Sequence, residues 1–147
     1  MREFNVDISI SEEFYYNIIN IDSVFKMGTL YFQEKEEWYS FTPVPGDGSC
    51  LFYSLSYLLF NRNIHRAQDL RMQCCEYVRI NGERFNQFIA SHITEESLTI
   101  DDYILRLQDP RSYGDHIEIL CLAEIYNFSA RVYVHEGDTN LREYALS

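Results

Sequence analysis

The chain has 147 residues, of which 46% are hydrophobic and 16% aromatic, enough for one globular domain with a sizeable core but not for a second domain of ordinary size. Its net charge of −11 and isoelectric point near 4.7 argue against a nucleic-acid backbone or an anionic membrane surface as a partner, and favour a basic partner. The longest near-apolar run, residues 51–60, is too short to span a bilayer.

The first forty residues predict a helix followed by a hairpin. They lack the basic flank and the long apolar region of a secretion signal, so a cytoplasmic protein is expected, or one that acts in the host cytoplasm if it comes from a pathogen. Ser11 and the two glutamates after it can begin a helix through residues 14–19 that ends before Gly28. Residues 29–33 and 38–41 are rich in β-favouring side chains on either side of a charged turn, which predicts two paired strands.

The stretch from Pro43 to Leu55 carries the clearest chemical signal. Two prolines and two glycines form a restricted turn that delivers Cys50 to the start of an apolar helix. The free N–H groups and the partial positive charge of a helix N-terminus favour a thiolate over a thiol, and the loop amides could hold a developing oxyanion. The sequence therefore predicts a reactive cysteine at position 50.

The rest of the chain predicts helices and then strands, an α+β or α/β/α layout with the sheet late. Cys74 and Cys121 are expected to pack in the core, and the helix that carries Cys121 is apolar nearly all round and is expected in the centre. Predicted helices cover residues 67–80, a short segment marked by Phe85, Phe88 and Ile89, residues 103–108 with Thr99 as N-cap, and residues 116–126 with Asp115 as cap; predicted strands cover residues 130–134 and 141–146.

Cysteine and histidine spacing gives no sign of a metal site or a disulfide framework. Two of the four cysteines are adjacent within one predicted helix, so reduced thiols are expected. No Cys-x-x-Cys pair is present, and the four histidines are scattered. No metal and no cofactor are therefore predicted.

Two blocks of sequence resemble the ovarian-tumour (OTU) family of papain-like cysteine proteases, and within it the DUBA-like branch of deubiquitinases. The first is Asp-Gly-Ser-Cys-Leu-Phe at residues 47–52; about sixty residues later come Tyr-Gly-Asp-His-Ile-Glu-Ile at residues 113–119 and Ala-Glu-Ile-Tyr-Asn at residues 123–127. Tyr113 stands where many members have tryptophan. The resemblance implies an α+β, papain-like OTU fold with a small central sheet between helical layers. It also implies a single domain, with residues 1–40 as an N-terminal extension and residues 41–147 as the catalytic core.

The resemblance implies a deubiquitinating thiol protease, a ubiquitinyl hydrolase that releases ubiquitin or a ubiquitin-like modifier from lysine through a thioester. Cys50 would be the nucleophile, Asp47 the acidic residue of the nucleophile loop, and the backbone of Gly48, Ser49 and Cys50 the oxyanion hole. Asp47 could instead serve only as a turn residue. The chain is expected to be a monomer, and its implied partner is ubiquitin or a polyubiquitin chain, whose basic tail suits an acidic groove.

The general base is not identified in the sequence. In the family a histidine precedes an aromatic residue and then Asn or Asp on a late strand, and no such tripeptide is present here. Three explanations stay open: the sequence is truncated before that histidine, which is favoured; the domain is inactive; or another histidine is recruited. His135 is the candidate for recruitment, His116 is expected to make a structural hydrogen bond, and His65 and His92 are expected to be exposed.

Two other functions also stay open. One is a catalytically inactive, OTU-like ubiquitin-binding or scaffold module, suggested by the missing histidine; the other is a papain-like thiol hydrolase that acts on an unrelated amide. Glu118 and Glu124 are expected to satisfy nearby backbone or solvent rather than to act as paired general acids.

Overall fold

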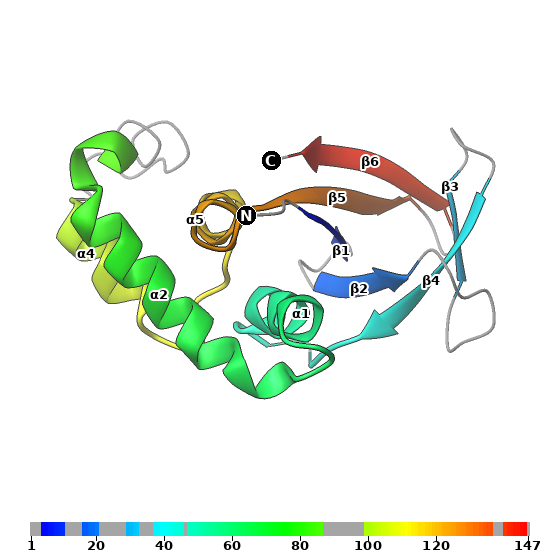
Figure 1. Cartoon of the computed structure of the whole chain (residues 1–147), viewed down its shortest axis with the longest axis horizontal. Coiled ribbons are helices and arrows are strands. Elements are labelled where there is room, and N and C mark those ends of the chain that lie inside the picture. Colours follow the sequence, from blue (N-terminus) through cyan, green and yellow to red (C-terminus); the bar gives the residue numbers. More distant parts are fainter. Residues whose placement is uncertain are drawn as a thin grey trace.

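The computed structural model of the chain describes residues 4–10, 16–20, 29–32, 37–45, 47–86, 99–136 and 140–146, with side chains at residues 8, 44, 45, 47–86 and 99–132. In Figure 1 the helices gather on one side of the molecule and the strands on the other, which confirms the predicted α+β class. Within the described ranges, no helix combines the length and the apolar character needed to cross a membrane.

Six strands close on themselves in the order β1-β2-β4-β3-β6-β5. The expected sheet is therefore present, but it forms a ring beside the helices rather than a layer between them (Figure 1). The β1–β5 and β3–β6 pairs are parallel and the other four are antiparallel. The strands are β1 (Phe4–Ile10), β2 (Tyr16–Asn20), β3 (Thr29–Phe32), β4 (Glu37–Pro43), β5 (Phe128–Glu136) and β6 (Asn140–Leu146).

The N-terminal region differs from the sequence prediction. The helix expected over residues 14–19 is wrong, because residues 16–20 form strand β2. Pairing with β1 on one edge and β4 on the other outweighs the local helix signal, with Ile18 opposite both Ile8 and Thr42. Residues 11–15 and 21–28 lie outside the described part of the chain. The expectation of a late sheet is also wrong, since four strands precede the first helix.

The other predicted elements are confirmed where the structure describes them. The predicted hairpin is present as β3 and β4, although residues 33–36 of its charged turn lie outside the described residues. Phe85 is buried in the helical residues 82–86, whereas Phe88 and Ile89 are not described. Thr99 caps α4 through a capping box. Asp115 is the N-cap residue of α5, and its N–H donates to the Glu118 carboxylate. The helices are α1 (Cys50–Leu59), the 3-10 turn η1 (Ile64–Arg66), α2 (Ala67–Ile80), α4 (Ile100–Leu107) and α5 (His116–Tyr126).

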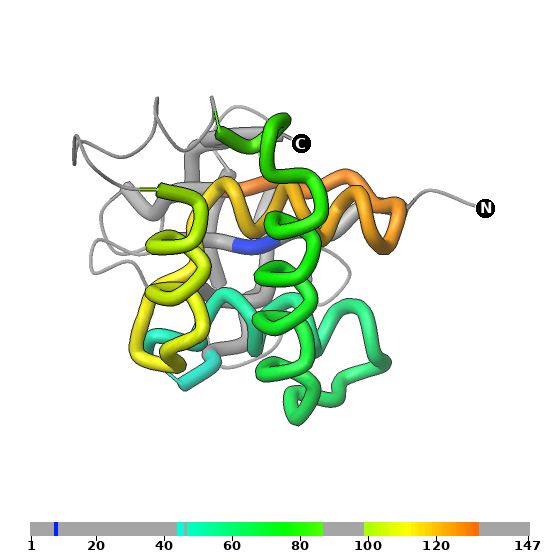
Figure 2. The backbone as a smooth tube through the Cα atoms, turned by 90° about the vertical axis from the view of Figure 1, so that its left-hand side faces the viewer, coloured from blue at the N-terminus to red at the C-terminus, as the bar shows by residue number. Residues whose placement is uncertain are grey.

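One core joins the helices to the strands. Helix α2 contacts both α4 and α5, and Figure 2 shows α2 beside α4. Helix α5 also contacts β5, and six of its eleven residues are buried, which confirms its central position. Ile8 of β1 is fully buried in the same core, so the N-terminal strand packs with the helices. All four cysteines are buried thiols without a disulfide, and Cys74 and Cys121 pack in the core as predicted.

Asn127 connects α5 to β5. It has a φ of 58° and caps α5 in the left-handed region, which asparagine tolerates better than most residues. The asparagine of the second sequence block therefore has a backbone role at the helix-to-strand turn.

Candidate active site

The nucleophile loop, defined here as residues 47–49, leads directly into α1. Cys50 is the first residue of that helix, as predicted, and its N–H donates to the Asp47 carbonyl oxygen at 3.1 Å. Leu51, Phe52 and Leu55 are fully buried and anchor the helix in the core. The cysteine is thereby held at the positive end of the α1 dipole.

Asp47 has the turn role that the sequence allowed. Its side chain is exposed, and its Oδ1 accepts the Ser49 N–H at 2.9 Å. Of the three amides predicted to form the oxyanion hole, those of Ser49 and Cys50 thus donate to Asp47 in this structure. The Ser49 amide holds a carboxylate oxygen, which shows that it can bind an anionic oxygen. The catalytic role of Asp47 stays a prediction.

Two glycines bring the distant sequence blocks into contact. A Cβ on Gly48 would lie 2.3 Å from both the carbonyl carbon and oxygen of Arg111, so the backbones meet at a distance that only glycine permits. A Cβ on Gly114 would lie 2.7 Å from Leu51 Cδ2 and 3.1 Å from Phe52 Cε2. The second block therefore packs directly on the first turn of α1 through Gly114, and Arg111, just before that block, packs on the nucleophile loop.

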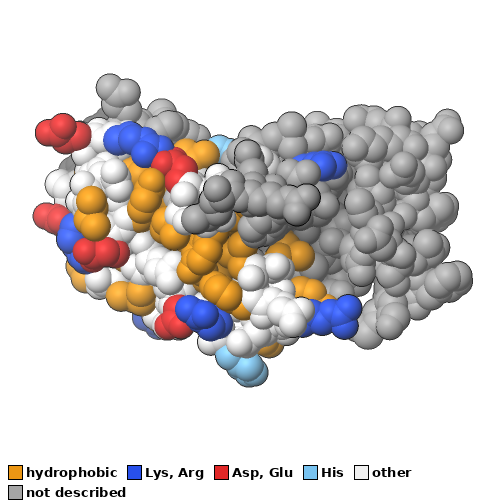
Figure 3. Space-filling model, viewed as in Figure 1, with side chains coloured by type: hydrophobic (Ala, Val, Ile, Leu, Met, Phe, Trp, Pro, Cys, Tyr) orange, Lys and Arg blue, Asp and Glu red, His pale blue; other side chains and the backbone are white. Residues whose placement is uncertain are grey.

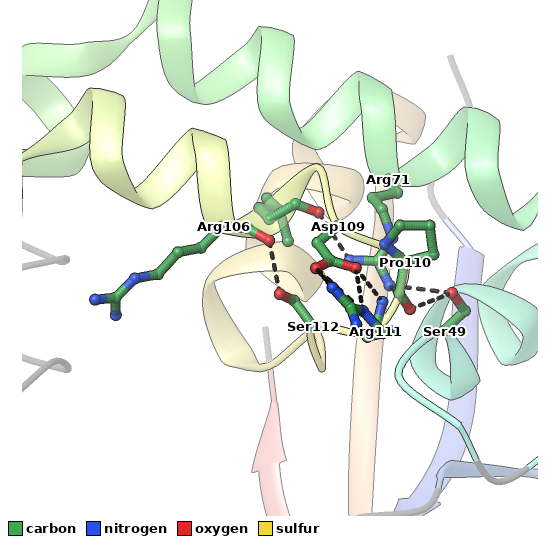
Figure 4. A network of polar contacts seen from close by, with 8 residues as sticks. Ser49, Arg71, Arg106, Asp109, Pro110, Arg111 and Ser112 are labelled. Atoms are coloured by element: carbon green, nitrogen blue, oxygen red, sulfur yellow. Dashed lines mark hydrogen bonds and ion pairs between the residues drawn. The ribbon is translucent and has the colours of Figure 1, made fainter.

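Arg71 of α2 is a residue of this site that the sequence analysis missed. Its side chain is fully buried, and its guanidinium joins the nucleophile loop to the segment after α4 (Figure 4). Nη1 donates to the Leu107 carbonyl at 2.8 Å; Nη2 lies 3.0 Å from the Gly48 carbonyl, 3.1 Å from Ser49 Oγ and 3.2 Å from the Pro110 carbonyl. The signal was available in the sequence, because Arg71 lies one turn before the adjacent cysteines on the apolar face of the predicted helix.

The environment of Arg71 is that of a buried cation. Its Cζ lies 4.6 Å from the centre of the Phe52 ring, in reach of a cation–π interaction. Burial lowers the pKa of Arg71 from its ordinary value, while nearby Cys75 and Glu118 act in the opposite direction. The cation is therefore held by carbonyl groups, one hydroxyl and one ring.

The segment after α4 is itself fixed by local hydrogen bonds. The Asp109 carboxylate accepts the Arg111 N–H and its Nη2, each at 2.9 Å, and the hydrogen bonds from Arg111 lower the pKa of Asp109 to about 2. Ser112 Oγ donates to the Arg106 carbonyl at 2.6 Å (Figure 4). Ser49 Oγ donates to the Pro110 carbonyl at 3.1 Å, so the nucleophile loop is hydrogen-bonded to this turn.

Glu118 is buried beside this network. Its carboxylate accepts the Tyr103 hydroxyl and, at 2.8 Å, the Asp115 N–H, as expected for a glutamate that satisfies nearby backbone. Burial raises the pKa of Glu118 to about 7, although both hydrogen bonds act to lower it. Glu124 lies on the exposed side of α5 and accepts the Tyr77 hydroxyl and Arg84 Nη2.

The histidines are placed at several points of the fold. His65 is exposed on η1, as predicted, and His116 is the half-buried first residue of α5. The backbone of His135 lies in β5, but its side chain, like all of His92, is outside the described residues. Recruitment of His135 as a base stays one of the open alternatives, beside the favoured truncation before the catalytic histidine.

Cys50 itself is fully buried in this structure. Attack on a substrate carbonyl therefore requires the atoms that cover the thiol to move. The loop, the helix terminus and the buried arginine are in place before that opening.

Comparison with known proteins gives consistent matches. The model of the OTU-like cysteine protease family matches residues 45–146. The chain is 33% identical over 96 residues to "Ubiquitin thioesterase otu2" of Schizosaccharomyces pombe, covering 64% of this chain and 32% of the relative. It is 30% identical over 98 residues to "OTU domain-containing protein 5" of Homo sapiens, covering 66% of this chain and 16% of the relative. The chain thus spans about a third of these curated relatives or less.

A solved structure shows the same fold. "Structure of Ovarian Tumor (OTU) domain in complex with Ubiquitin" aligns with a TM-score of 0.56 and 21% identity, over 85% of this chain and 79% of that chain. The family match covers the nucleophile loop, α1 and the second sequence block.

Proposed function

Because the chain belongs to the OTU family of cysteine proteases, we propose that it is a deubiquitinase that cleaves ubiquitin from lysine side chains through a thioester on Cys50. One observation carries the proposal. Cys50 begins α1 on a loop that Arg71 and the backbone of Arg111 hold in place. Similarity to a ubiquitin thioesterase and to an OTU domain solved in complex with ubiquitin supports ubiquitin as the modifier.

The proposed reaction is acyl transfer in two steps. The Cys50 thiolate attacks the carbonyl carbon of the modifier's last residue, and the carbonyl electron pair moves to oxygen. Collapse of this intermediate breaks the C–N bond, and the lysine amine leaves with a proton. Water then attacks the thioester, which releases the modifier's carboxylate and restores the thiol. An imidazole is needed to carry the proton, and His135 is the candidate tested below.

The nucleophile loop gives the substrate oxygen a place to bind. In the resting structure the Ser49 N–H holds the Asp47 carboxylate. In the proposed mechanism the developing oxyanion replaces that carboxylate as acceptor of the Ser49 N–H, which frees Asp47 to orient the base. Substrate binding would expose Cys50 in the same movement.

The surface supports a protein partner. On the face shown in Figure 3, hydrophobic side chains gather over the helical part and are bordered by charged side chains of both signs. The large exposed hydrophobic residues among the described ones are Met72, Ile80, Leu105 and Tyr113. Of these four exposed residues, Tyr113 is close to the helix that carries Cys50, because it is next to Gly114, which packs on α1.

The test is labelling by ubiquitin that carries a C-terminal electrophile. We expect one adduct on Cys50, none in Cys50→Ala, and an unchanged adduct in Cys75→Ala, whose thiol is buried in α2. His135→Ala should slow labelling if His135 is the base, and leave it unchanged if it is not. A folded protein that includes any residues that follow Ser147 and still forms no adduct on Cys50 would refute the proposal.

A second candidate function is ubiquitin binding without catalysis. It is favoured by the full burial of Cys50 and by the engagement of two loop amides with Asp47. Titration of the wild-type chain with ubiquitin distinguishes the two. Saturable binding together with no adduct and no hydrolysis supports the binding module.

A further inference from the structure

We propose that Arg71 is a positioning residue that fixes the direction of the Ser49 amide in the nucleophile loop. The catalytic meaning of this inference rests on the proposed function, whereas the orientation itself does not. Arg71 lies in α2, whereas Cys50 begins α1. Arg71 donates a hydrogen bond to the Gly48 carbonyl, so it acts through the loop backbone and not on a substrate.

The Gly48–Ser49 peptide is held by Arg71 through its carbonyl group. Arg71 Nη2 donates to the Gly48 carbonyl at 3.0 Å. In a trans peptide the carbonyl and the following N–H point in opposite directions, and the described chain has no cis peptide bond. Holding the Gly48 carbonyl toward Arg71 therefore directs the Ser49 N–H away from it, where it meets the Asp47 carboxylate at 2.9 Å.

Further contacts prevent this peptide from turning over. The same Nη2 lies 3.1 Å from Ser49 Oγ, so one nitrogen contacts both the Gly48 carbonyl and the Ser49 side chain. Nη1 and Nη2 are anchored on the Leu107 and Pro110 carbonyls, which belong to a different segment. The approach of Gly48 to the Arg111 backbone closes the other side. A rotated Gly48–Ser49 peptide would lose the arginine and leave a buried cation with fewer acceptors.

The buried charge points to a role beyond filling space. Burying a cation carries a desolvation penalty, and an apolar side chain could occupy the same volume beside Phe52 without it. What an apolar side chain cannot do is hold four acceptors from two segments. A cation on the Gly48 carbonyl also polarises the peptide, which makes the Ser49 N–H a stronger donor to an anionic oxygen.

The experiment compares Arg71→Lys and Arg71→Met with Arg79→Met. Arg79 is on the same helix but is exposed and pairs only with Glu76 among the described residues. The first readout is amide hydrogen exchange by NMR. We expect the Ser49 amide to exchange about tenfold faster or more in Arg71→Met, less so in Arg71→Lys, and as in wild type in Arg79→Met. The Tyr53 amide, which donates to the Ser49 carbonyl inside α1, should change little in all three.

The second readout is hydrolysis of a fluorogenic ubiquitin amide. An oriented amide that acts on the oxyanion alone lowers kcat and leaves KM nearly unchanged, so kcat should fall about 10- to 100-fold in Arg71→Met and KM should stay within about threefold. Alkylation of Cys50 by iodoacetamide forms no oxyanion. The alkylation rate of Arg71→Met should therefore stay within about threefold of the wild-type rate.

The outcomes separate the two proposals. If the protein, tested with any residues that follow Ser147, neither hydrolyses the substrate nor reacts with the ubiquitin probe, the proposed function fails, and the Ser49 exchange still decides the role of Arg71. If Arg71→Met does not fold, Arg71→Lys carries the test, because the ammonium preserves the charge. Unchanged Ser49 exchange in a folded Arg71 variant would overturn the inference. Equal acceleration of amide exchange at Ser49, Tyr53 and Cys50 would also overturn it, because that result indicates a general loosening of the loop and α1.

Discussion

Gly48 and Arg111 are 63 positions apart in the sequence, yet a Cβ on Gly48 would lie 2.3 Å from the Arg111 carbonyl carbon. This contact joins the nucleophile loop to the turn that follows α4. Because the atoms on the Arg111 side belong to the backbone, they cannot move aside as the end of a side chain can.

Gly48→Ala is therefore expected to be one of the most damaging substitutions in the chain. The added methyl group must displace backbone in a packed site, at a cost of about 3 kcal/mol or more. It should also disturb the Gly48 carbonyl that Arg71 holds. Denaturant unfolding measures the first effect, and loss of labelling by the ubiquitin probe measures the second.

Gly82→Ala is the matched control. A Cβ there would lie 3.2 Å from Ile100 Cδ1, the end of a flexible side chain, and Gly82 lies in the helical residues 82–86. We expect a change within about 1 kcal/mol, and it could be stabilising because alanine favours helix over glycine. Equal losses in the two variants would show that the Gly48–Arg111 contact is not special.

Ile8 tests whether the N-terminal strand belongs to the core. Its side chain is fully buried, and β1 pairs with β5 along its whole length. Ile8→Ala should lower the free energy of unfolding by about 2–5 kcal/mol, whereas Ile80→Ala, at a side chain that is 73% exposed, should change it by less than about 0.5 kcal/mol. If Ile8→Ala unfolds like the wild type, Ile8 does not contribute to the core.

The sequence predicted the helices well because their signals are local. The bounds of α2 follow from apolar spacing, and Thr99 and Asp115 mark helix starts by their capping chemistry. The position of Cys50 at the start of α1 follows from the same kind of local evidence. These features depend on neighbours within four residues, which a single sequence displays.

The missed features depend on partners far along the chain. Strand β2 exists because β1 and β4 pair with both of its edges, and Tyr16 to Asn20 carry a short apolar pattern that also fits a helix. Arg71 looks like one more charged helix residue until the fold brings Gly48, Leu107 and Pro110 around it. Asp47 could be named from the sequence, but the direction of its carboxylate could not.

Thr99 provides a test of the capping box of α4. Its hydroxyl accepts the Asp102 N–H at 3.1 Å, and the Asp102 carboxylate accepts the Thr99 N–H at 3.3 Å. Thr99→Ala removes one of the two bonds and should cost about 1 kcal/mol in chemical denaturation. Asp101→Ala, next to the box but outside it, should cost only a few tenths of a kcal/mol. A larger loss at Asp101 than at Thr99 would contradict the capping assignment.

Glu118 should make the stability of the fold depend on pH. Burial raises its pKa in the folded chain to about 7 from an ordinary value of 4.5, so the folded state binds the proton more tightly than the unfolded state. The stabilisation is complete below pH 4.5 and is lost as the pH rises through 7, by up to about 3 kcal/mol. Denaturant unfolding at a series of pH values should show this decline in the wild type.

Glu118→Gln should remove the decline, because the amide stays neutral and can still accept the Asp115 N–H. The difference in unfolding free energy between wild type and this variant should therefore change between about pH 4.5 and 7. Glu124→Gln is a control in which the pH dependence of stability has the opposite direction. The hydrogen bond from Arg84 lowers the pKa of Glu124, so its contribution is lost as the pH falls below its ordinary value. If Glu118→Gln and wild type show parallel stability curves from about pH 4.5 to 7, the folded chain does not hold Glu118 as a buried acid that ionises near neutrality.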